Sequence, residues 1–233
     1  TVTELRAKDA ASRRFVADVS HELRTPLTSM VALADVLAED AASGDGRAAE
    51  LVAAEIRRLN RLVGHLIEIS RFDAGAAALV LDDVNAAEAV AATLDARGWT
   101  NAVAVTGAAD LCVRLDPRRF DVVLANLVGN AVKHGRPPVT VRFGPADRDG
   151  RAGVEVTVTD HGPGLPDGLR DAIFDRFVKA DAARAASEGS GLGLSIAREN
   201  AVLHGGTLTA SDGTRGGAVF TLWLPAVPDE EAT

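Results

Sequence analysis

The spacing of apolar residues predicts helices in the first third of the chain. At about 100° per residue, six apolar side chains fall on one stripe: Phe15, Val19, Leu23, Met30, Leu33 and Leu37. A second helical stripe runs from Leu51 to Ile69, and the polar, glycine-bearing segment 41–46 separates the two. Two long helices joined by a short turn form an antiparallel hairpin, which we expect over residues 15–75. Its stripes are too wide to be buried within one hairpin, so we expect a homodimer in which two hairpins form a four-helix bundle.

Beyond residue 75 the helical period gives way to short strands and helices. Alternating or β-branched segments predict strands at 79–84, 102–106, 111–115, 139–143, 154–159, 207–210 and 218–224. Helices are expected at 86–95, from Pro117 onward and at 192–203. Residues 76–226 therefore predict an α+β domain, a mostly antiparallel sheet with helices on one face. Residues 1–14 are interpreted as a connecting helix and residues 227–233 as a frayed tail, so the fold class is multi-domain, α followed by α+β.

One polar position of the first helix is a candidate for chemistry. His21 lies opposite the apolar stripe, with the Glu22 carboxylate beside it and the Thr25 hydroxyl one turn further on. An imidazole held out of the core in this way can receive a group. The alternative, an ordinary exposed histidine on a charged helix, leaves unexplained why Pro26 interrupts a helix whose stripe continues.

Composition narrows the classes of function. A formal net charge of −8 and a pI near 5.1 argue against a nucleic-acid partner, which requires a basic surface. The single cysteine, Cys112, excludes an internal disulfide and fits a reducing compartment. No apolar run approaches the roughly 20 residues of a membrane span. Because the chain begins with Thr1 rather than Met, we expect a piece of a longer protein.

The helix that begins at Pro117 has a polar face suited to a magnesium-bound phosphate. Its members are spaced by whole turns: Asn126, Asn130, Lys133 and His134. Amide oxygens suit a hard cation such as Mg²⁺, and a lysine one turn further suits a phosphate. A polar helix face in contact with solvent alone is the alternative.

A predicted strand is followed directly by Asp160, Gly162 and Gly164. The Asp160 carboxylate can accept a hydrogen bond from a purine amino group, and glycines let a ligand approach the backbone. Taken alone, this segment is also compatible with an ordinary turn.

A glycine-rich turn before the last predicted helix provides a candidate phosphate site. It comprises Gly189, Ser190, Gly191, Leu192 and Gly193, and free N–H groups at a helix N-terminus bind anions. In the preceding segment 173–177 the aromatic residues are expected to pack, and Arg176 can contact a phosphate. Residues 178–188 between them have the composition of a mobile lid. The order of amides, aspartate, flexible segment and glycine turn predicts a nucleotide site.

These motifs resemble the conserved boxes of sensor histidine kinases. The segments SHELRTPLT, NLVGNAVKHG, DHGPGLP, IFDRF and GSGLGLSIA are similar to the H, N, G1, F and G2 boxes, in the family's order. The resemblance extends over about residues 8–226. It implies a dimerisation and phosphoacceptor hairpin followed by an ATP-binding α/β sandwich of the Bergerat type. The alanine-rich, tyrosine-free composition resembles that of kinases from high-GC actinobacteria.

The resemblance also implies roles for individual residues. His21 would be phosphorylated from ATP, with Glu22 as general base, and Thr25 would position the water that dephosphorylates the partner. Asn130, with Asn126 close by, would hold Mg²⁺, and Lys133 and Arg176 would contact phosphate. Asp160 would bind the adenine. His134 stands where many relatives have an aromatic residue near the nucleotide.

The implied partner is the receiver domain of a response regulator, which accepts the phosphoryl group on an aspartate. The implied location is the cytoplasmic side of a plasma-membrane sensor, with the membrane contacted only through segments upstream of Thr1. Whether phosphorylation occurs in cis or in trans stays open. The other histidines, His65, His161 and His204, are interpreted as surface residues without a catalytic role.

Two other functions compete with the kinase. A binding module would sense nucleotide or dock a partner with His21 idle, but a decayed site usually lacks one of the residues present here. An ATPase of the chaperone or topoisomerase type would share the nucleotide fold and would have no use for the hairpin that contains His21.

Overall fold

The computed structural model describes residues 19, 23, 26–28, 30, 47–165, 168–178, 190–214 and 216–226. These residues pack as two compact units. The first contains the described residues up to Glu68 together with Ser190, and the second contains the others, from Ile69 to Ala226. No helix within the described ranges combines the length and the apolar character needed to cross a membrane.

The first unit is helical. Helix α2 runs over Arg47–Asp73, as the second apolar stripe predicts, and its last turn, from Ile69, belongs to the second unit. The described residues of the preceding predicted helix are helical as well. Among them Val19, Leu23 and Met30 are half-buried, whereas Leu27 and Thr28 are exposed. This difference in burial agrees with the predicted stripe.

The second unit contains a five-stranded sheet in the order β2-β4-β5-β7-β6. Its strands are β2 (Val103–Gly107), β4 (Val139–Arg148), β5 (Arg151–Thr159), β6 (Thr207–Asp212) and β7 (Ala218–Pro225). Only the pairing of β2 with β4 is parallel, which confirms the mostly antiparallel sheet. Strands β1 (Asp82–Asn85) and β3 (Cys112–Leu115) form a separate antiparallel pair.

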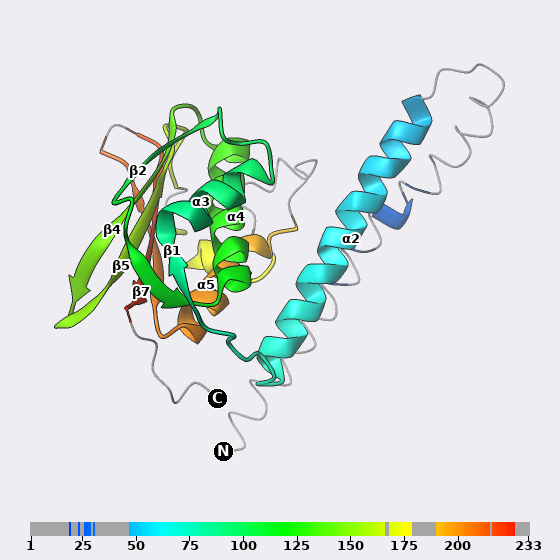
Figure 1. Ribbon diagram of the computed structural model, residues 1–233. Coiled ribbons are helices and arrows are strands. Elements are labelled where there is room, and N and C mark those ends of the chain that lie inside the picture. Colours follow the sequence, from blue (N-terminus) through cyan, green and yellow to red (C-terminus); the bar gives the residue numbers. More distant parts are fainter. Residues whose placement is uncertain are drawn as a thin grey trace. The chain divides into compact units, whose positions relative to one another are not determined.

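Helices α3 (Ala86–Asp95), α4 (Pro117–His134) and α5 (Gly193–Leu203) lie on one side of this sheet (Figure 1). Helix α4 begins where predicted, because the Asp116 carboxylate accepts hydrogen bonds from the N–H groups of Arg118 and Arg119 and proline is tolerated in the first turn. A short 3₁₀ helix, η1 (Ala172–Phe174), precedes α5.

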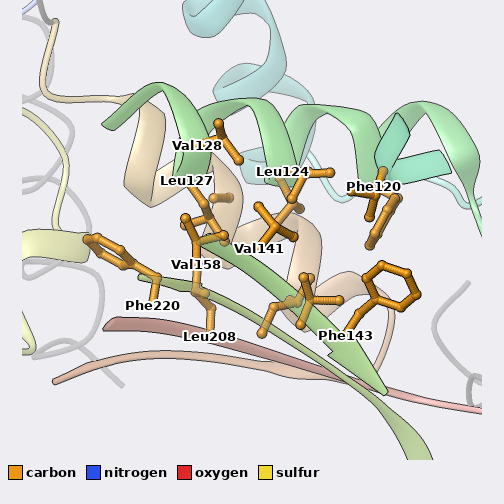
Figure 2. Close-up of a cluster of buried hydrophobic side chains, with 14 of the residues drawn as sticks. Phe120, Leu124, Leu127, Val128, Val141, Phe143, Val158, Leu208 and Phe220 are labelled. Atoms are coloured by element: carbon orange, nitrogen blue, oxygen red, sulfur yellow. The ribbon is translucent and has the colours of Figure 1, made fainter. Parts of the chain in front are cut away.

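The core lies between these helices and the sheet. Figure 2 shows α4 side chains such as Leu124 and Leu127 facing Val141 of β4, Val158 of β5 and Phe220 of β7. Alternate residues of β5 are buried, as expected for a sheet covered on one face. Ile173 and Phe174 are buried too, which confirms that these residues pack.

The start of one predicted strand and the burial of one histidine differ from what the sequence predicts. The predicted strand 79–84 begins only at Asp82, because the Val80 N–H donates to the Asp116 side chain at 2.9 Å instead of joining a β ladder. His204, predicted to lie on the surface, is 2% exposed. It caps the C-terminus of α5, and its ring is hydrogen-bonded inside the second unit.

Candidate functional site

Helix α4 places the two predicted magnesium ligands side by side at the edge of the core. Its buried stripe includes Val123, Leu127 and Ala131, so Asn126 and Asn130 on the neighbouring face are half-buried. The Asn126 Nδ2 donates to the Val122 carbonyl at 2.8 Å, which orients the side-chain amide. A Cβ built on Gly193 would collide with the Asn126 Oδ1. The amide oxygen therefore lies against the first residue of α5.

The last turn of α4 presents the two remaining polar residues predicted on this helix. Lys133 and His134 are exposed, and both positions follow Asn126 and Asn130 by about one or two turns. Gly135 ends the helix, and its N–H donates to the Ala131 carbonyl at 3.0 Å. The last turn of α4 therefore places a cation, Lys133, one turn after Asn130 on the same helix.

Asp160 is a buried carboxylate at the end of β5. Asp160 is 3% exposed, and its Oδ1 accepts hydrogen bonds from the N–H groups of Gly162 at 2.7 Å and Ala218 at 3.4 Å. These two bonds orient the carboxylate. A buried carboxylate with a fixed orientation is better suited to bind one polar group of a ligand than to contact bulk solvent.

Three glycines make room for Asp160. A Cβ on Gly135 would meet the Asp160 side chain, and one on Gly162 would meet both Gly135 and the Asp160 carboxylate. Gly217 has φ +83°, and a Cβ there would overlap the Asp160 carbonyl oxygen. The segments that follow α4, β5 and β6 therefore converge on this carboxylate without side chains between them.

The glycine turn before α5 is joined to the segment that contains Arg176. The Phe177 N–H donates to the Gly191 carbonyl at 2.9 Å, and both residues have positive φ angles, +63° and +69°. Gly191 lies so close to the Phe177 backbone that a Cβ would not fit. Leu192 is fully buried, so only its backbone is available to a ligand of this turn.

Gly164 lies in a loop that is attached to β6. The Asp212 carboxylate accepts from the Leu165 N–H at 3.0 Å and pairs with Arg170 at 2.6 Å. The Leu165 hydrogen bond, followed by that from Arg170, lowers the pKa of Asp212. Gly164 has φ +81° and lies next to Asp212 and Gly217, so this loop belongs to the same cluster as Asp160.

Arg176 forms a bidentate ion pair. Its guanidinium donates to the two carboxylate oxygens of Asp73, in the last turn of α2, at 2.6 and 2.8 Å. This hydrogen bonding lowers the pKa of Asp73 and raises that of Arg176. The predicted phosphate ligand therefore already contacts an anionic group within the second unit.

Several predicted site residues are not placed in this cluster. His21, Glu22, Thr25 and Gly189 lie outside the described residues. Ser190 belongs to the first unit, where its Oγ lies 3.4 Å from Nδ1 of His65. Its role as a nucleotide ligand stays a prediction.

Sequence reasoning did not identify Gly135, Gly217 and Ala218 as members of the cluster. A signal was present, since Gly216 and Gly217 directly precede a strongly apolar strand. Two consecutive glycines there indicate a close backbone approach, but they do not say which residue is approached.

The cluster fits a nucleotide by the chemistry of its groups. It combines a buried, oriented carboxylate, two half-buried amides, a lysine and a glycine turn at a helix N-terminus. A carboxylate can bind an exocyclic amino group, amide oxygens can bind Mg²⁺, and the free N–H groups of α5 can bind phosphate. The glycines around Asp160 let the backbone segments approach it more closely than any side chain would allow.

Comparisons with known proteins identify two domains. A family model described as His Kinase A (phospho-acceptor) domain matches residues 11–75. A second, described as Histidine kinase-, DNA gyrase B-, and HSP90-like ATPase, matches residues 115–228. Together the two matches include His21, Asn126, Asn130 and Asp160.

Individual relatives agree with these matches. The chain is 51% identical to the signal transduction histidine-protein kinase AfsQ2 of Streptomyces coelicolor, over 99% of this chain and 45% of the relative. It therefore spans less than half the length of that curated relative. Among solved structures, the Acinetobacter baumannii histidine kinase AdeS has a TM-score of 0.69 at 21% identity and covers 88% of this chain and 98% of its own.

A second solved structure includes a partner. The histidine kinase ThkA, in complex with the response regulator protein TrrA, matches with a TM-score of 0.68 at 23% identity. The match covers 94% of this chain and 63% of ThkA. At this identity the likeness supports the fold alone: a helical region followed by an α/β domain.

Proposed function

The chain belongs to the histidine kinases of two-component signal transduction, and we propose that it transfers the γ-phosphoryl group of ATP to His21 and from there to an aspartate of a response-regulator receiver domain. The observation that supports this most is the packing of Asn126 against Gly193 in the same unit as the buried Asp160. This packing joins one amide of α4 to the glycine turn, and Gly135 at the end of the same helix lies against Asp160, in a chain that also has a phosphoacceptor domain.

Each side chain has a definite task in this proposal. Asp160 accepts a hydrogen bond from the adenine amino group, while Gly162 and Gly164 keep the backbone free of side chains near the base. Asn130 and Asn126 provide oxygen ligands for Mg²⁺. Lys133 and Arg176 neutralise phosphate charge, with His134 near the nucleotide. The backbone of Gly189, Ser190, Gly191, Leu192 and Gly193 binds phosphate oxygens.

Phosphoryl transfer depends mainly on positioning and on neutralising charge. Bound ATP with Mg²⁺ would supply the phosphoryl group and much of that neutralisation. His21 acts as the nucleophile in its neutral form, which predominates at pH 7 for an imidazole with a pKa near 6.5. Glu22 takes up the proton that the imidazole releases.

Regulator dephosphorylation is the second activity that we propose. Thr25 follows His21 by four positions in the sequence, and its hydroxyl would position the attacking water. The receiver domain is the proposed partner, in line with the complex formed by ThkA and TrrA.

The proposed arrangement of the longer protein follows from its domains. Residues 1–14 form a signalling helix, 15–75 the dimerisation and phosphotransfer hairpin, 76–226 the catalytic domain and 227–233 a tail. The hairpin pairs with that of a second copy. A sensor portion beyond this chain would connect it to the plasma membrane and leave the described domains on the cytoplasmic side.

The test is incubation with γ-labelled ATP and Mg²⁺. We expect acid-labile, alkali-stable label on the native chain, loss of that label in His21→Gln, and retention in the control His161→Gln. The His161 Nδ1 donates to the Pro138 carbonyl oxygen at 2.9 Å, a contact that a glutamine amide can replace.

Other results would favour the competing functions. Nucleotide binding without label on the native chain would indicate a binding module. ATP hydrolysis without a phosphoprotein would indicate an ATPase of the chaperone or topoisomerase type. Label that persists in His21→Gln would show that another residue is the acceptor.

A further inference from the structure

The last turn of α2 and the segment after it are attached to the rest of the second unit at a fixed point. Arg119 donates to the Ala78 carbonyl at 3.2 Å, and its guanidinium lies 5.5 Å from the centre of the Phe72 ring. The Val80 N–H donates to the Asp116 carboxylate at 2.9 Å. Ile69 is 1% exposed. These contacts tie residues 69–80 to the first turn of α4.

This attachment is buried and therefore costly to open. Asp116 is 3% exposed, and its N–H donates to Nε2 of the buried His204 at 3.1 Å. Arg119 also donates to Oδ1 of the buried Asn200 at 2.8 Å. Removing the His204 ring or the Arg119 guanidinium would take a hydrogen-bond partner away from a buried polar group.

The ion pair between Asp73 and Arg176 differs from this attachment because it is accessible. The two side chains retain 53% and 29% of their exposure, respectively. Exposed ion pairs contribute little to stability, so another anion can displace the carboxylate at small cost. The pair holds the end of α2 at a second point, and this point is releasable.

The position of Arg176 identifies the competing anion. Arg176 directly precedes Phe177, whose N–H is bonded to the Gly191 carbonyl of the glycine turn. This turn leads to the N-terminus of α5, the phosphate site of the proposed function. The Asp73 carboxylate binds the guanidinium in the same bidentate geometry that a phosphate would use.

We propose that Asp73 and the phosphates of a nucleotide compete for Arg176, so that nucleotide binding breaks this ion pair and frees the end of α2 at its second, exposed point of attachment. This inference rests on the proposed function, because it requires ATP at the glycine turn. Asp73 is then a positioning residue that acts through Arg176. Because linkage is reciprocal, any change that favours the ion pair weakens nucleotide binding, and the opposite holds as well.

Calorimetric titration with the non-hydrolysable analogue AMPPNP and Mg²⁺ tests the competition. We expect Asp73→Asn to bind AMPPNP about two- to fivefold more tightly than the native chain, the range expected for removal of an exposed competing pair. Adenosine, which has no phosphate, should bind equally to both. Asp95→Asn, the same charge change at another exposed helix-terminal aspartate, is the control and should bind both ligands as the native chain does.

Hydrogen exchange tests the release. The amides of Ala74, Gly75 and Ala76 are bonded to carbonyls at the end of α2. In the native chain AMPPNP should speed their exchange. In Asp73→Asn their exchange should be fast from the start and unaffected by the analogue.

Specific outcomes would overturn the inference. Unchanged or weaker AMPPNP binding by Asp73→Asn, or an equal gain for adenosine, would show that Asp73 has no phosphate-specific effect while leaving the proposed function intact. Exchange at Ala74–Ala76 that does not respond to AMPPNP in the native chain would have the same meaning. A native chain that binds no AMPPNP would overturn the inference and the proposed function together.

Discussion

At the scale of the residue, His204 shows how a buried imidazole acquires one protonation state. Its Nε2 accepts the Asp116 N–H at 3.1 Å, and its Nδ1 lies 2.7 Å from the Asn200 carbonyl. Nε2 must be unprotonated to accept, so Nδ1 is the donor and the ring is neutral. Burial lowers the pKa of His204, an effect that the Asn200 hydrogen bond and the Asp116 charge oppose and the Arg119 charge supports.

This neutral ring predicts a pH dependence of stability. Below about pH 6.5, the ordinary pKa of histidine, His204 takes up a proton in the unfolded chain but stays neutral in the folded one. The unfolded state then binds more protons, so the free energy of unfolding decreases as the pH falls from about 6.5 toward the lowered pKa. A single group contributes up to about 1.4 kcal/mol per pH unit within this window.

Tryptophan fluorescence can follow this effect in one unit alone, because the two tryptophans, Trp99 and Trp223, both belong to the second unit. We expect the free energy of unfolding, measured with urea, to fall less between pH 7 and pH 5 in His204→Gln than in the native chain. His65→Gln is the control, since the pKa of His65 is also lowered by burial but His65 belongs to the first unit. Equal slopes in His204→Gln and the native chain would contradict the prediction.

The residue scale also shows the limit of prediction from sequence. Asp160 could be identified because it follows a β-branched strand and precedes two glycines. Its glycine neighbours Gly135 and Gly217 lie far away in the chain and approach it only after the sheet has formed. His204 was misassigned for a similar reason, because its burial depends on Asp116, which is 88 residues away.

At the scale of the element, local patterns located the helices better than the strand ends. Helix α3 has the bounds that were predicted, and the Asn85 side chain accepts from the Glu88 N–H at its start. Strand β4 was expected to end at Phe143 but continues to Arg148, through a glycine and a proline that disfavour strands. Pairing with β5 in a long hairpin overrides that local preference.

Two glycines test how closely the elements approach one another. Gly150 and Gly217 have similar φ angles of +76° and +83°, but a Cβ on Gly150 would meet nothing within 4 Å, whereas one on Gly217 would overlap the backbone of Asp160. We expect Gly150→Ala to lower the free energy of unfolding by about 1–2 kcal/mol, the cost of a left-handed alanine. Gly217→Ala should cost at least about 2 kcal/mol more, since the backbone must also move.

The same pair of variants separates stability from binding. Displacement of Asp160 in Gly217→Ala should weaken AMPPNP binding, measured by calorimetry at a temperature where the variant is folded. Gly150→Ala should bind AMPPNP as the native chain does. Equal loss of stability in the two variants would contradict the close approach of Gly217 to the Asp160 backbone.

At the scale of the whole molecule, one surface of α2 has the character of an interface. Ile56, Val63 and Ile67 are 46%, 42% and 52% exposed, and their spacing of seven and four residues places them on one helical stripe. In the second unit, by contrast, most large apolar side chains are buried in one core. A second copy of the chain would cover it in the proposed homodimer.

Charge placed in this stripe should therefore act on assembly and not on folding. Val63→Lys puts an ammonium group at the centre of the stripe, where dimer formation would remove it from water. Since burying an unpaired charge costs well over about 1.4 kcal/mol, we expect the dimer dissociation constant to rise about tenfold or more. Val202→Lys changes another exposed valine, 57% accessible on α5, and should leave the constant unchanged. Sedimentation over a range of concentrations measures both dissociation constants, and circular dichroism shows whether each variant retains its helices.

A dissociation constant that Val63→Lys leaves unchanged, with the helices intact, would exclude this stripe from the dimer interface. An equal rise in Val202→Lys would mean that added charge weakens association wherever it lies, so that the hairpin has no special part in it.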